Sequence, residues 1–457
     1  MLRVFDTAKR QLVELETREP GKVSMYVCGP TVYDVPHLGH GRFAIVFDVI
    51  RRYLEWRGFE VRFVSNITDI EDKIITRAGE EGRSTDEVVA EYTAAWFDAM
   101  DALGVRRPDD VPTATGYVAQ MVDYIAELVA RGRAYETPDG VYLSVETVEG
   151  YGLLAQQDLD RMQAGGGERD IVGAEHKRAP LDFALWKKAK PGEPAWDSPW
   201  EPGRPGWHIE CTVMSLDLLG EGFDIHGGGD DLRFPHHENE RAQAVAAGRR
   251  FARYWLHNGM VLGKGGQKMS KSLGNYLSLT DLLARDGFDP RALRMLVLRA
   301  KYRSPVEVAD DHLADAGAQV QRLDALARRI PPAAAGVEPD AAVVDRFRGT
   351  MDDDFNTPAA VAVLMDAVRD ANTALDAGDE GRAARLAAAA FEIAGAVGLV
   401  VGAEAEPVPP EALEKARRRD EARVAKDWAT ADLLRDELVG AGFVVEDTPA
   451  GTTLRRP

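Results

Sequence analysis

Two histidines of the stretch HLGH, His37 and His40, lie where a helix is predicted to follow a strand. Residues 22–27 alternate in polarity, apolar residues at 43–54 recur at helical spacing, and a second strand at 59–64 completes a βαβ unit. The imidazoles therefore lie at a helix N-terminus, where backbone amides favour a phosphate. No GxGxxG or P-loop pattern occurs there, and HxGH alone is equally compatible with two loop histidines.

A second motif, KMSKS at 268–272, occurs far downstream in the glycine-rich stretch 263–275, whose lysines could close over a polyphosphate. Together, HLGH and KMSKS are the paired signatures of class I aminoacyl-tRNA synthetases, and the chain resembles the cysteinyl-tRNA synthetase family from end to end. The resemblance implies that four residues are catalytic: His37, His40, Lys268 and Lys271. By the same resemblance these four residues are expected to contact ATP, together with Gly39, Met269, Ser270 and Ser272.

The chain contains two cysteines, Cys28 and Cys211, which are too few for a disulfide framework. Taken alone they could be two small buried residues, because free cysteine is among the most buried residue types. A helix is predicted over 232–245, and His236 and Glu240 lie four residues apart in it and so share a face. These four side chains form a plausible zinc set, although their spacing alone is a weak signal. The resemblance places all four on the family's ligand positions and implies one Zn2+ per chain.

A zinc site suits the selection of cysteine as a substrate. An ordinary pocket would reject serine, which differs by one atom, by only about 1 to 3 kcal/mol. Zinc prefers a thiolate to a neutral hydroxyl, so stronger discrimination and no editing step are expected. Four protein ligands describe a closed structural site, so we expect five-coordination on substrate binding or a loosely held Glu240. By resemblance Thr68 and Trp207 contact the substrate cysteine, although Thr68 is equally compatible with a helix N-cap.

The stretch FDIHGGGDD at 223–231 predicts a strand that runs into three glycines. Gly227, Gly228 and Gly229 would let a flat adenine or ribose approach the backbone, and Asp231 is placed to accept from ribose hydroxyls. A plain glycine turn is the alternative. We expect these four residues to complete the ATP site, with Mg2+ accompanying the nucleotide.

With 457 residues, the chain is expected to form roughly three or four domains. The predicted fold class is α/β: a Rossmann-like parallel-sheet catalytic domain with an insertion, then an α-helical bundle and a small C-terminal anticodon-binding domain. The expected boundaries are 1–116 and 203–262 for the catalytic halves, 117–202 for the insertion, 263–306 for the KMSKS loop and stem-contact region, 307–400 for the bundle, 401–413 for a linker and 414–457 for the anticodon-binding end. The insertion is too short for the large editing domain of some class I relatives.

The net charge of -19 argues against nonspecific binding to nucleic acid, but the charge is unevenly distributed. Residues 241–303 contain thirteen Lys or Arg and three Asp, which indicates a polyanion partner besides ATP; a solvated basic face is the usual alternative. Residues 277–303, with the stretch FDPRALRMLVLRAKYRS, are predicted to contain a basic amphipathic helix segment that lies against the inner corner of the tRNA. By resemblance Arg423, Asp432 and Asp447 contact the anticodon, and a plain helix-surface role is the alternative.

The start of the chain contains no signal-peptide pattern and no apolar stretch is long enough to span a membrane, so a cytoplasmic protein without a membrane partner is expected. The resemblance implies a monomeric cysteine-tRNA ligase that binds L-cysteine, ATP and tRNA(Cys) and forms cysteinyl-adenylate. Two alternatives stay open. One is the related cysteine:amino-sugar ligase of mycothiol synthesis, which lacks the anticodon-binding end. The other is a noncatalytic nucleotide-binding paralogue, which would not need both motif lysines.

Overall fold

The computed structural model describes residues 1–155, 176–268, 278–330, 336–402, 409–448 and 451–455. Its centre is a four-stranded parallel sheet in the order β10-β9-β3-β4. The strands are β3 (Lys22–Val27), β4 (Glu60–Ser65), β9 (Ile225–Gly229) and β10 (Tyr254–Asn258). Because β3 pairs with β9, strands from both halves of the sequence share one sheet, and the predicted Rossmann-like fold is confirmed.

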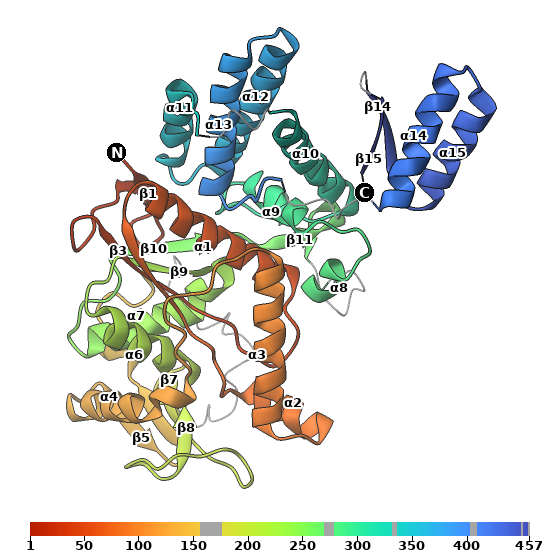
Figure 1. Cartoon of the computed structure of the whole chain (residues 1–457). Coiled ribbons are helices and arrows are strands. Elements are labelled where there is room, and N and C mark those ends of the chain that lie inside the picture. Colours follow the sequence, from red (N-terminus) through yellow and green to blue (C-terminus); the bar gives the residue numbers. More distant parts are fainter. Residues whose placement is uncertain (156–175, 269–277, 331–335, 403–408, 449–450, 456–457) are drawn as a thin grey trace.

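Helix α1 (Leu38–Trp56) crosses from β3 to β4 and lies between the sheet and the helical bundle (Figure 1). Most of the helix is buried, including two charged residues, Arg42 and Asp48. The Asp48 Oδ2 atom accepts from Arg294 Nη1 at 2.7 Å, which fixes α1 to a helix of the C-terminal half. The first half also contains β1 (Arg3–Asp6), β2 (Gln11–Glu14), α2 (Asp72–Glu81) and α3 (Thr85–Ala102).

The insertion folds beside the main sheet, at the lower end of the molecule in Figure 1. It consists of α4 (Val118–Ala130) and an antiparallel sheet of β5 (Ala134–Thr137), β6 (Gly140–Leu143), β7 (Phe183–Lys188) and β8 (Gly203–Pro205). After β8 the chain enters α6 (Trp207–Leu219) and later α7 (Glu238–Ala246). These two helices pack against each other.

A three-stranded sheet follows the catalytic sheet and carries the start of KMSKS. It contains β11 (Val261–Gly263), β12 (Gln267–Lys268) and β13 (Val306–Glu307) in the order β12-β11-β13. The helix predicted in the stretch FDPRALRMLVLRAKYRS is confirmed as α9 (Pro290–Leu298), and a short helix, α8 (Leu279–Leu283), precedes it. Gly287, at φ +68°, lies between them, and the Asp289 side chain caps α9.

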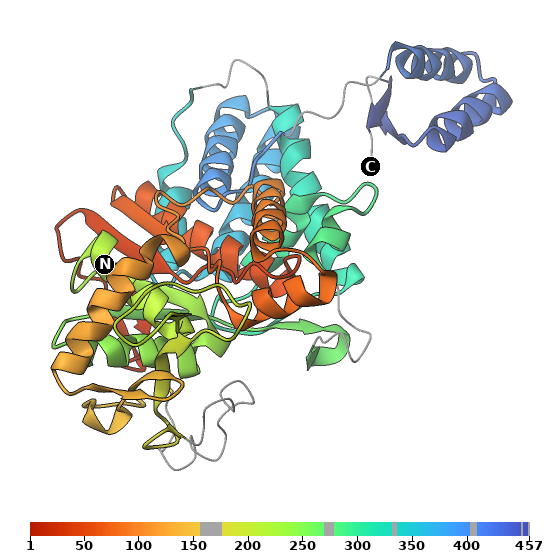
Figure 2. The ribbon, with the colours of Figure 1, turned by 90° about the horizontal axis from the view of Figure 1, so that it is seen from below.

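The predicted helical bundle is confirmed and contains α10 (Asp310–Arg329), α11 (Ala341–Met351), α12 (Thr357–Asp376) and α13 (Glu380–Ala396). A separate C-terminal unit contains α14 (Pro410–Val424), α15 (Trp428–Gly440), β14 (Val444–Thr448) and β15 (Gly451–Arg455) around its own small apolar core. Figures 1 and 2 both show this unit beyond the bundle, away from the central sheet. Among the described segments, no helix is long and apolar enough to cross a membrane.

Candidate active site and metal centre

The four predicted metal ligands converge beside the C-terminal end of the central sheet. Cys28 follows β3 directly, Cys211 lies in α6, His236 in the turn before α7, and Glu240 in α7. All four are buried, and one ligand atom from each lies within 4.8 Å of the others. The sequence separated these residues by up to 212 positions, and the fold brings them to one point.

Glu240 lies at the centre of the cluster. Its Oε1 atom is 3.3 Å from Cys28 Sγ and 3.1 Å from His236 Nε2. The other ring nitrogen of His236, Nδ1, is 3.0 Å from His208 Nδ1, and Trp207 stacks on the His236 ring with centroids 4.1 Å apart. A ring fixed on its far side in this way is typical of a metal-binding histidine.

The helix predicted across 232–245 is only partly correct. Residues 233–237 form one π-helical turn, interrupted at Phe234, whose backbone is extended, and α7 begins at Glu238. His236 therefore precedes the α-helix. Its side chain nevertheless meets that of Glu240, so the predicted shared face is present.

The protonation preferences of the cluster suit a divalent cation. Burial lowers the pKa of His236 to about 3, so its imidazole is neutral at pH 7 and can act as a ligand. Burial raises the pKa of the Cys28 and Cys211 thiols, so without a cation both would stay protonated. Glu240 Oε2 is buried without a well-directed hydrogen bond in the described structure, and such an acceptor is costly. The donor set therefore fits a thiophilic metal.

Sequence reasoning missed a second group of histidines under the cluster. His226 Nε2 lies 3.1 Å from Glu240 Oε2, and His226 and His237 form an alternative ligand group with Cys28 and Glu240. His237 Nδ1 is 2.8 Å from His257 Nε2, which continues the chain of imidazoles. The adjacent pair of histidines at 236–237 and the histidine before the three glycines were the available signals.

The two HLGH histidines cap the N-terminus of α1. His37 Nδ1 accepts from the His40 backbone N–H at 3.2 Å, and His40 Nδ1 accepts from the His37 N–H at 3.3 Å. The rings stack with centroids 3.6 Å apart. Removal from water, followed by the neighbouring His37, lowers the pKa of His40 well below its ordinary value. The neutral ring can therefore accept the capping hydrogen bond at Nδ1.

The three glycines predicted to admit ATP lie inside β9, and two of them make room for the protein itself. A Cβ atom at Gly227 would lie 2.3 Å from the Phe47 ring, and one at Gly228 would lie 2.6 Å from His237. Gly229 ends the strand, and Asp231 lies exposed after it. Close packing of α1 and the histidines against β9 therefore explains part of this pattern.

Thr68 is buried beside the cluster and does not cap a helix. Its Oγ1 donates to Glu210 Oε2 at 2.7 Å, whereas the N-cap of α2 is Glu71, so the N-cap alternative is wrong. Glu210 lies fully buried on α6, and burial raises its pKa well above the ordinary value. Sequence reasoning missed Glu210, although it immediately precedes Cys211.

The remaining predicted residues lie in two other places. Lys268 is the last residue of β12 and pairs with Leu262, whereas Met269, Ser270, Lys271 and Ser272 lie outside the described residues. Arg423 lies on α14, Asp432 is exposed on α15, and Asp447 lies on β14 opposite Thr452, all in the C-terminal unit.

The basic run at 241–303 does not form one continuous basic face. Many of its side chains pair with acids from outside the run, which the sequence could not show. The pairs include Arg249 with Glu127, Arg285 with Asp310, Arg291 with Asp324, Arg294 with Asp48 and Arg303 with Asp354. The fold thus neutralises much of the charge that indicated a polyanion partner.

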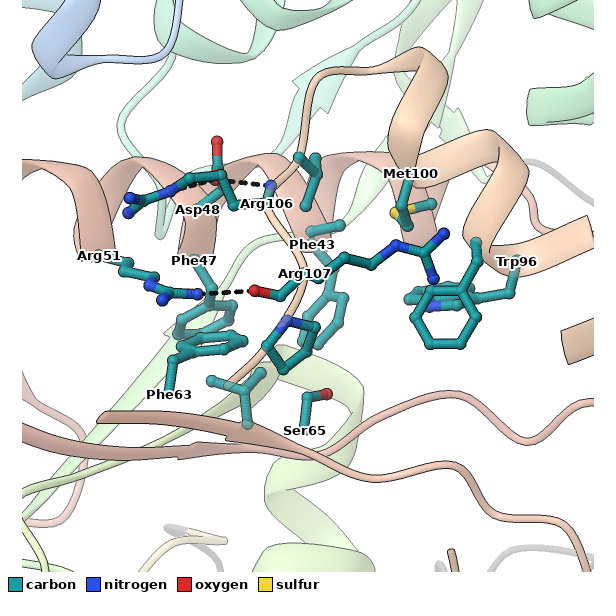
Figure 3. Close-up of a pocket in the computed structure, with 15 residues that line it drawn as sticks. Phe43, Phe47, Asp48, Arg51, Phe63, Ser65, Trp96, Met100, Arg106 and Arg107 are labelled. Atoms are coloured by element: carbon teal, nitrogen blue, oxygen red, sulfur yellow. Dashed lines mark hydrogen bonds and ion pairs between the residues drawn. The ribbon is translucent and has the colours of Figure 1, made fainter. Parts of the chain in front are cut away.

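A cavity that is partly open to solvent is lined by residues of α1, β4 and α3 and of the segment that follows α3. Figure 3 shows its apolar lining, Phe43, Phe47, Phe63, Trp96 and Met100, together with Arg106 and Arg107. None of the predicted site residues lines it. The cavity is therefore distinct from the cluster.

Three families match the chain in succession. Residues 14–318 match the family of tRNA synthetases class I (C) catalytic domains, residues 346–401 match the DALR domain, and residues 409–455 match the cysteinyl-tRNA ligase anticodon binding domain. The first match alone spans more than half of the chain.

Comparison with individual proteins also identifies cysteine-tRNA ligases as relatives. The chain is 45% identical over 474 residues to a cysteine-tRNA ligase of Pectobacterium carotovorum and 47% identical over 471 residues to one of Chromobacterium violaceum, with 100% of each chain covered. Among solved structures, methionyl-tRNA synthetase of Mycobacterium tuberculosis with methionyl-adenylate is similar at a TM-score of 0.59 and 16% identity, covering 86% of this chain and 92% of that chain. A LeuRS of Agrobacterium radiobacter has a TM-score of 0.61 at 11% identity, covering 84% and 85%. The structural similarities show the fold.

Proposed function

Because this chain belongs to the cysteine-tRNA ligase family, we propose that it joins L-cysteine to tRNA(Cys) in two steps that use ATP. The observation that carries this proposal is the buried cluster of Cys28, Cys211, His236 and Glu240, in which Cys28 follows β3, the strand that leads into the HLGH start of α1. A thiol-selecting group next to a phosphate-binding helix start is what cysteine activation requires.

In the first step, a carboxylate oxygen of cysteine attacks the α-phosphorus of ATP, the bond to the β-phosphate oxygen breaks, and pyrophosphate leaves. Positioning and charge neutralisation carry such a transfer. His37, His40 and the N-terminal amides of α1 would hold the phosphates on one side, with Lys268 and Lys271 on the other. Mg2+ is expected to accompany ATP. In the second step a terminal ribose hydroxyl of the tRNA attacks the cysteinyl carbonyl, and AMP leaves.

We further propose that Cys28, Cys211, His236 and Glu240 hold one Zn2+. Bound there, zinc would supply a soft Lewis acid that accepts the substrate thiolate far better than a serine hydroxyl. The protein's contribution is orientation: His208 and Trp207 fix the His236 ring.

Neighbouring residues would shape the pocket around the substrate cysteine. Trp207 covers one side of the cluster, and Thr68 lies fixed to the buried carboxyl of Glu210. We infer that Thr68 and Trp207 contact the substrate, with Thr68 held in place by its hydrogen bond to Glu210.

The C-terminal unit supports tRNA recognition over the amino-sugar alternative. Residues 409–455 match an anticodon-binding family, which a ligase for an amino sugar would not need. We propose that Arg423, Asp432 and Asp447 contact anticodon bases from this unit. A monomer in the cytoplasm is also expected, and light scattering and cell fractionation would test these two points.

Cysteine-dependent exchange of pyrophosphate into ATP, followed by charging of tRNA(Cys), tests the proposal directly. We expect both activities with cysteine and neither with serine or methionine. Exchange without tRNA charging, together with ligation to an amino sugar, would support the alternative ligase. Absence of cysteine-dependent exchange in the folded, metal-loaded protein would show that the chain is a noncatalytic relative.

A further inference from the structure

Arg42 lies two residues after HLGH, and its side chain is buried at 1% exposure. Its terminal nitrogens donate to three backbone carbonyls. Nη1 donates to Met260 O at 2.6 Å, and Nη2 donates to Tyr302 O at 3.2 Å and also to Ser304 O. The guanidinium therefore joins the start of α1 to two distant segments of backbone.

Those segments lie directly before β11 and β13, two strands of the sheet that carries the start of KMSKS. Met260 immediately precedes β11, and its carbonyl also accepts from the Val306 N–H of β13 at 3.0 Å. The Gly259 N–H donates to Tyr302 O at 2.8 Å, and a Cβ atom on Gly259 would lie 2.5 Å from Ser304 O, so the two backbones are in direct contact. β11 pairs in turn with β12, which ends at Lys268.

The far side of the KMSKS stretch is also attached to the start of α1. The Leu279 N–H donates to Pro36 O at 3.0 Å, and Ser278 forms a bridge with His37. The backbone on both sides of residues 269–277 is thus fixed to the segment that contains HLGH. Arg42 supplies the attachment on the β12 side.

The chemistry of Arg42 favours a geometric role over a stabilising one. Burial lowers its pKa to about 10, so it remains charged at neutral pH. A buried charge held only by carbonyls is costly, and a well-packed apolar side chain would often stabilise such a position as well. The other fully buried arginine near α1, Arg294, differs because it pairs with the carboxylate of Asp48. A planar fork of donors, however, can hold several acceptors at fixed positions.

We propose that Arg42 is a positioning residue that sets the spacing between the HLGH helix start and the KMSKS-bearing sheet. The inference rests on the proposed function, in which the two motifs hold opposite sides of the triphosphate. A displacement of about 1 Å between such groups can lower the rate roughly 100-fold. Ground-state binding of cysteine should be left intact, because the guanidinium of Arg42 donates to the carbonyls of Met260, Tyr302 and Ser304 and not to the four cluster residues.

The test compares Arg42→Met and Arg42→Ala with Arg52→Met in pyrophosphate exchange. Arg52 is a matched control because it lies on the same helix and binds Asp48 and the Gly104 carbonyl, away from the KMSKS sheet. We expect the Arg42 variants to lose about 10- to 100-fold in kcat, with KM for cysteine within about two-fold of wild type. Methylguanidinium should restore part of the kcat of Arg42→Ala. The control should keep wild-type kcat.

Amide hydrogen exchange provides a measurement that does not depend on activity. The Val306 N–H and the amides of β11 should exchange faster in Arg42→Met but not in Arg52→Met. Unchanged exchange there, or kcat within about two-fold of wild type, would overturn the positioning role. A parallel loss of kcat, cysteine affinity and thermal stability would equally overturn it by showing a general structural effect. Wild-type protein without cysteine-dependent exchange would contradict the proposed function instead, whatever the amides show.

Discussion

Cys211→Ser should reduce the preference for cysteine over serine to what an ordinary pocket provides. Cys211 is 2% exposed and contributes one of the two thiols in the cluster. The substitution replaces a soft sulfur ligand with a hydroxyl that binds zinc poorly while changing the side-chain volume little. Its effect should therefore fall on the metal more than on the fold.

The magnitude follows from the difference between the two kinds of recognition. Without the metal, one atom of difference between substrates is worth about 1 to 3 kcal/mol, or roughly 5- to 150-fold in kcat/KM. A site that uses a specific bond to the substrate group can reach roughly 10,000-fold or more. We therefore expect the cysteine-to-serine ratio of kcat/KM to fall by about 70-fold or more in the variant.

The assay is pyrophosphate exchange with cysteine and with serine, combined with zinc content measured by elemental analysis. Ser215→Ala is a matched control because Ser215 is also buried on α6, one turn further along, and its hydroxyl donates to the Thr212 carbonyl. The control should keep the metal and the wild-type ratio. Because the chain has only two cysteines, thiol titration of the wild type gives a clear second measurement. Both thiols should be unreactive while metal is bound.

Two results would refute this reasoning. A zinc-free Cys211→Ser protein that still prefers cysteine by more than about 1,000-fold would show that the pocket, without the metal, rejects serine. A native, active wild type in which both thiols titrate freely would show that neither is a ligand.

Three further predictions concern other parts of the chain. A chain that ends at Gly402 should keep cysteine-dependent exchange but lose much of its kcat/KM for tRNA charging, and equal charging would exclude a tRNA role for 409–455. Lys271→Ala should lower the adenylation rate far more than it weakens ATP binding. Equal losses of rate and of ATP affinity would show that Lys271 only binds ATP. The pKa of His40 is lower in the folded protein than in the unfolded chain. Below about pH 6.5 the unfolded chain therefore binds a proton at His40 that the folded protein does not. Stability should therefore fall with acidification there by up to about 1.4 kcal/mol per pH unit, and urea unfolding of His40→Gln should show a shallower fall.

The parts of this protein that depend on local patterns could be predicted from the sequence. The βαβ unit at 22–65, the helix at 118–130 and the bundle after residue 307 follow from periodicities that are set by neighbouring residues. The four cluster residues were identified by their chemistry and by resemblance, and the fold then placed them together. The helix predicted in FDPRALRMLVLRAKYRS also has a local start signal, because the Asp289 side chain caps α9.

The tertiary structure alone decided which charges and polar groups meet. The basic run at 241–303 predicted a face for a polyanion, yet acids from distant segments neutralise much of it. The glycines after His226 and the cysteine after Glu210 mark where these residues lie in the sequence but not which groups they meet, and Arg42 has the sequence context of any helix residue. Their roles depend on partners up to 262 positions away, brought within hydrogen-bond distance only when α1 is enclosed by the sheet and the C-terminal half. A single sequence records which groups are present, whereas burial beside a particular partner determines their charge and their function.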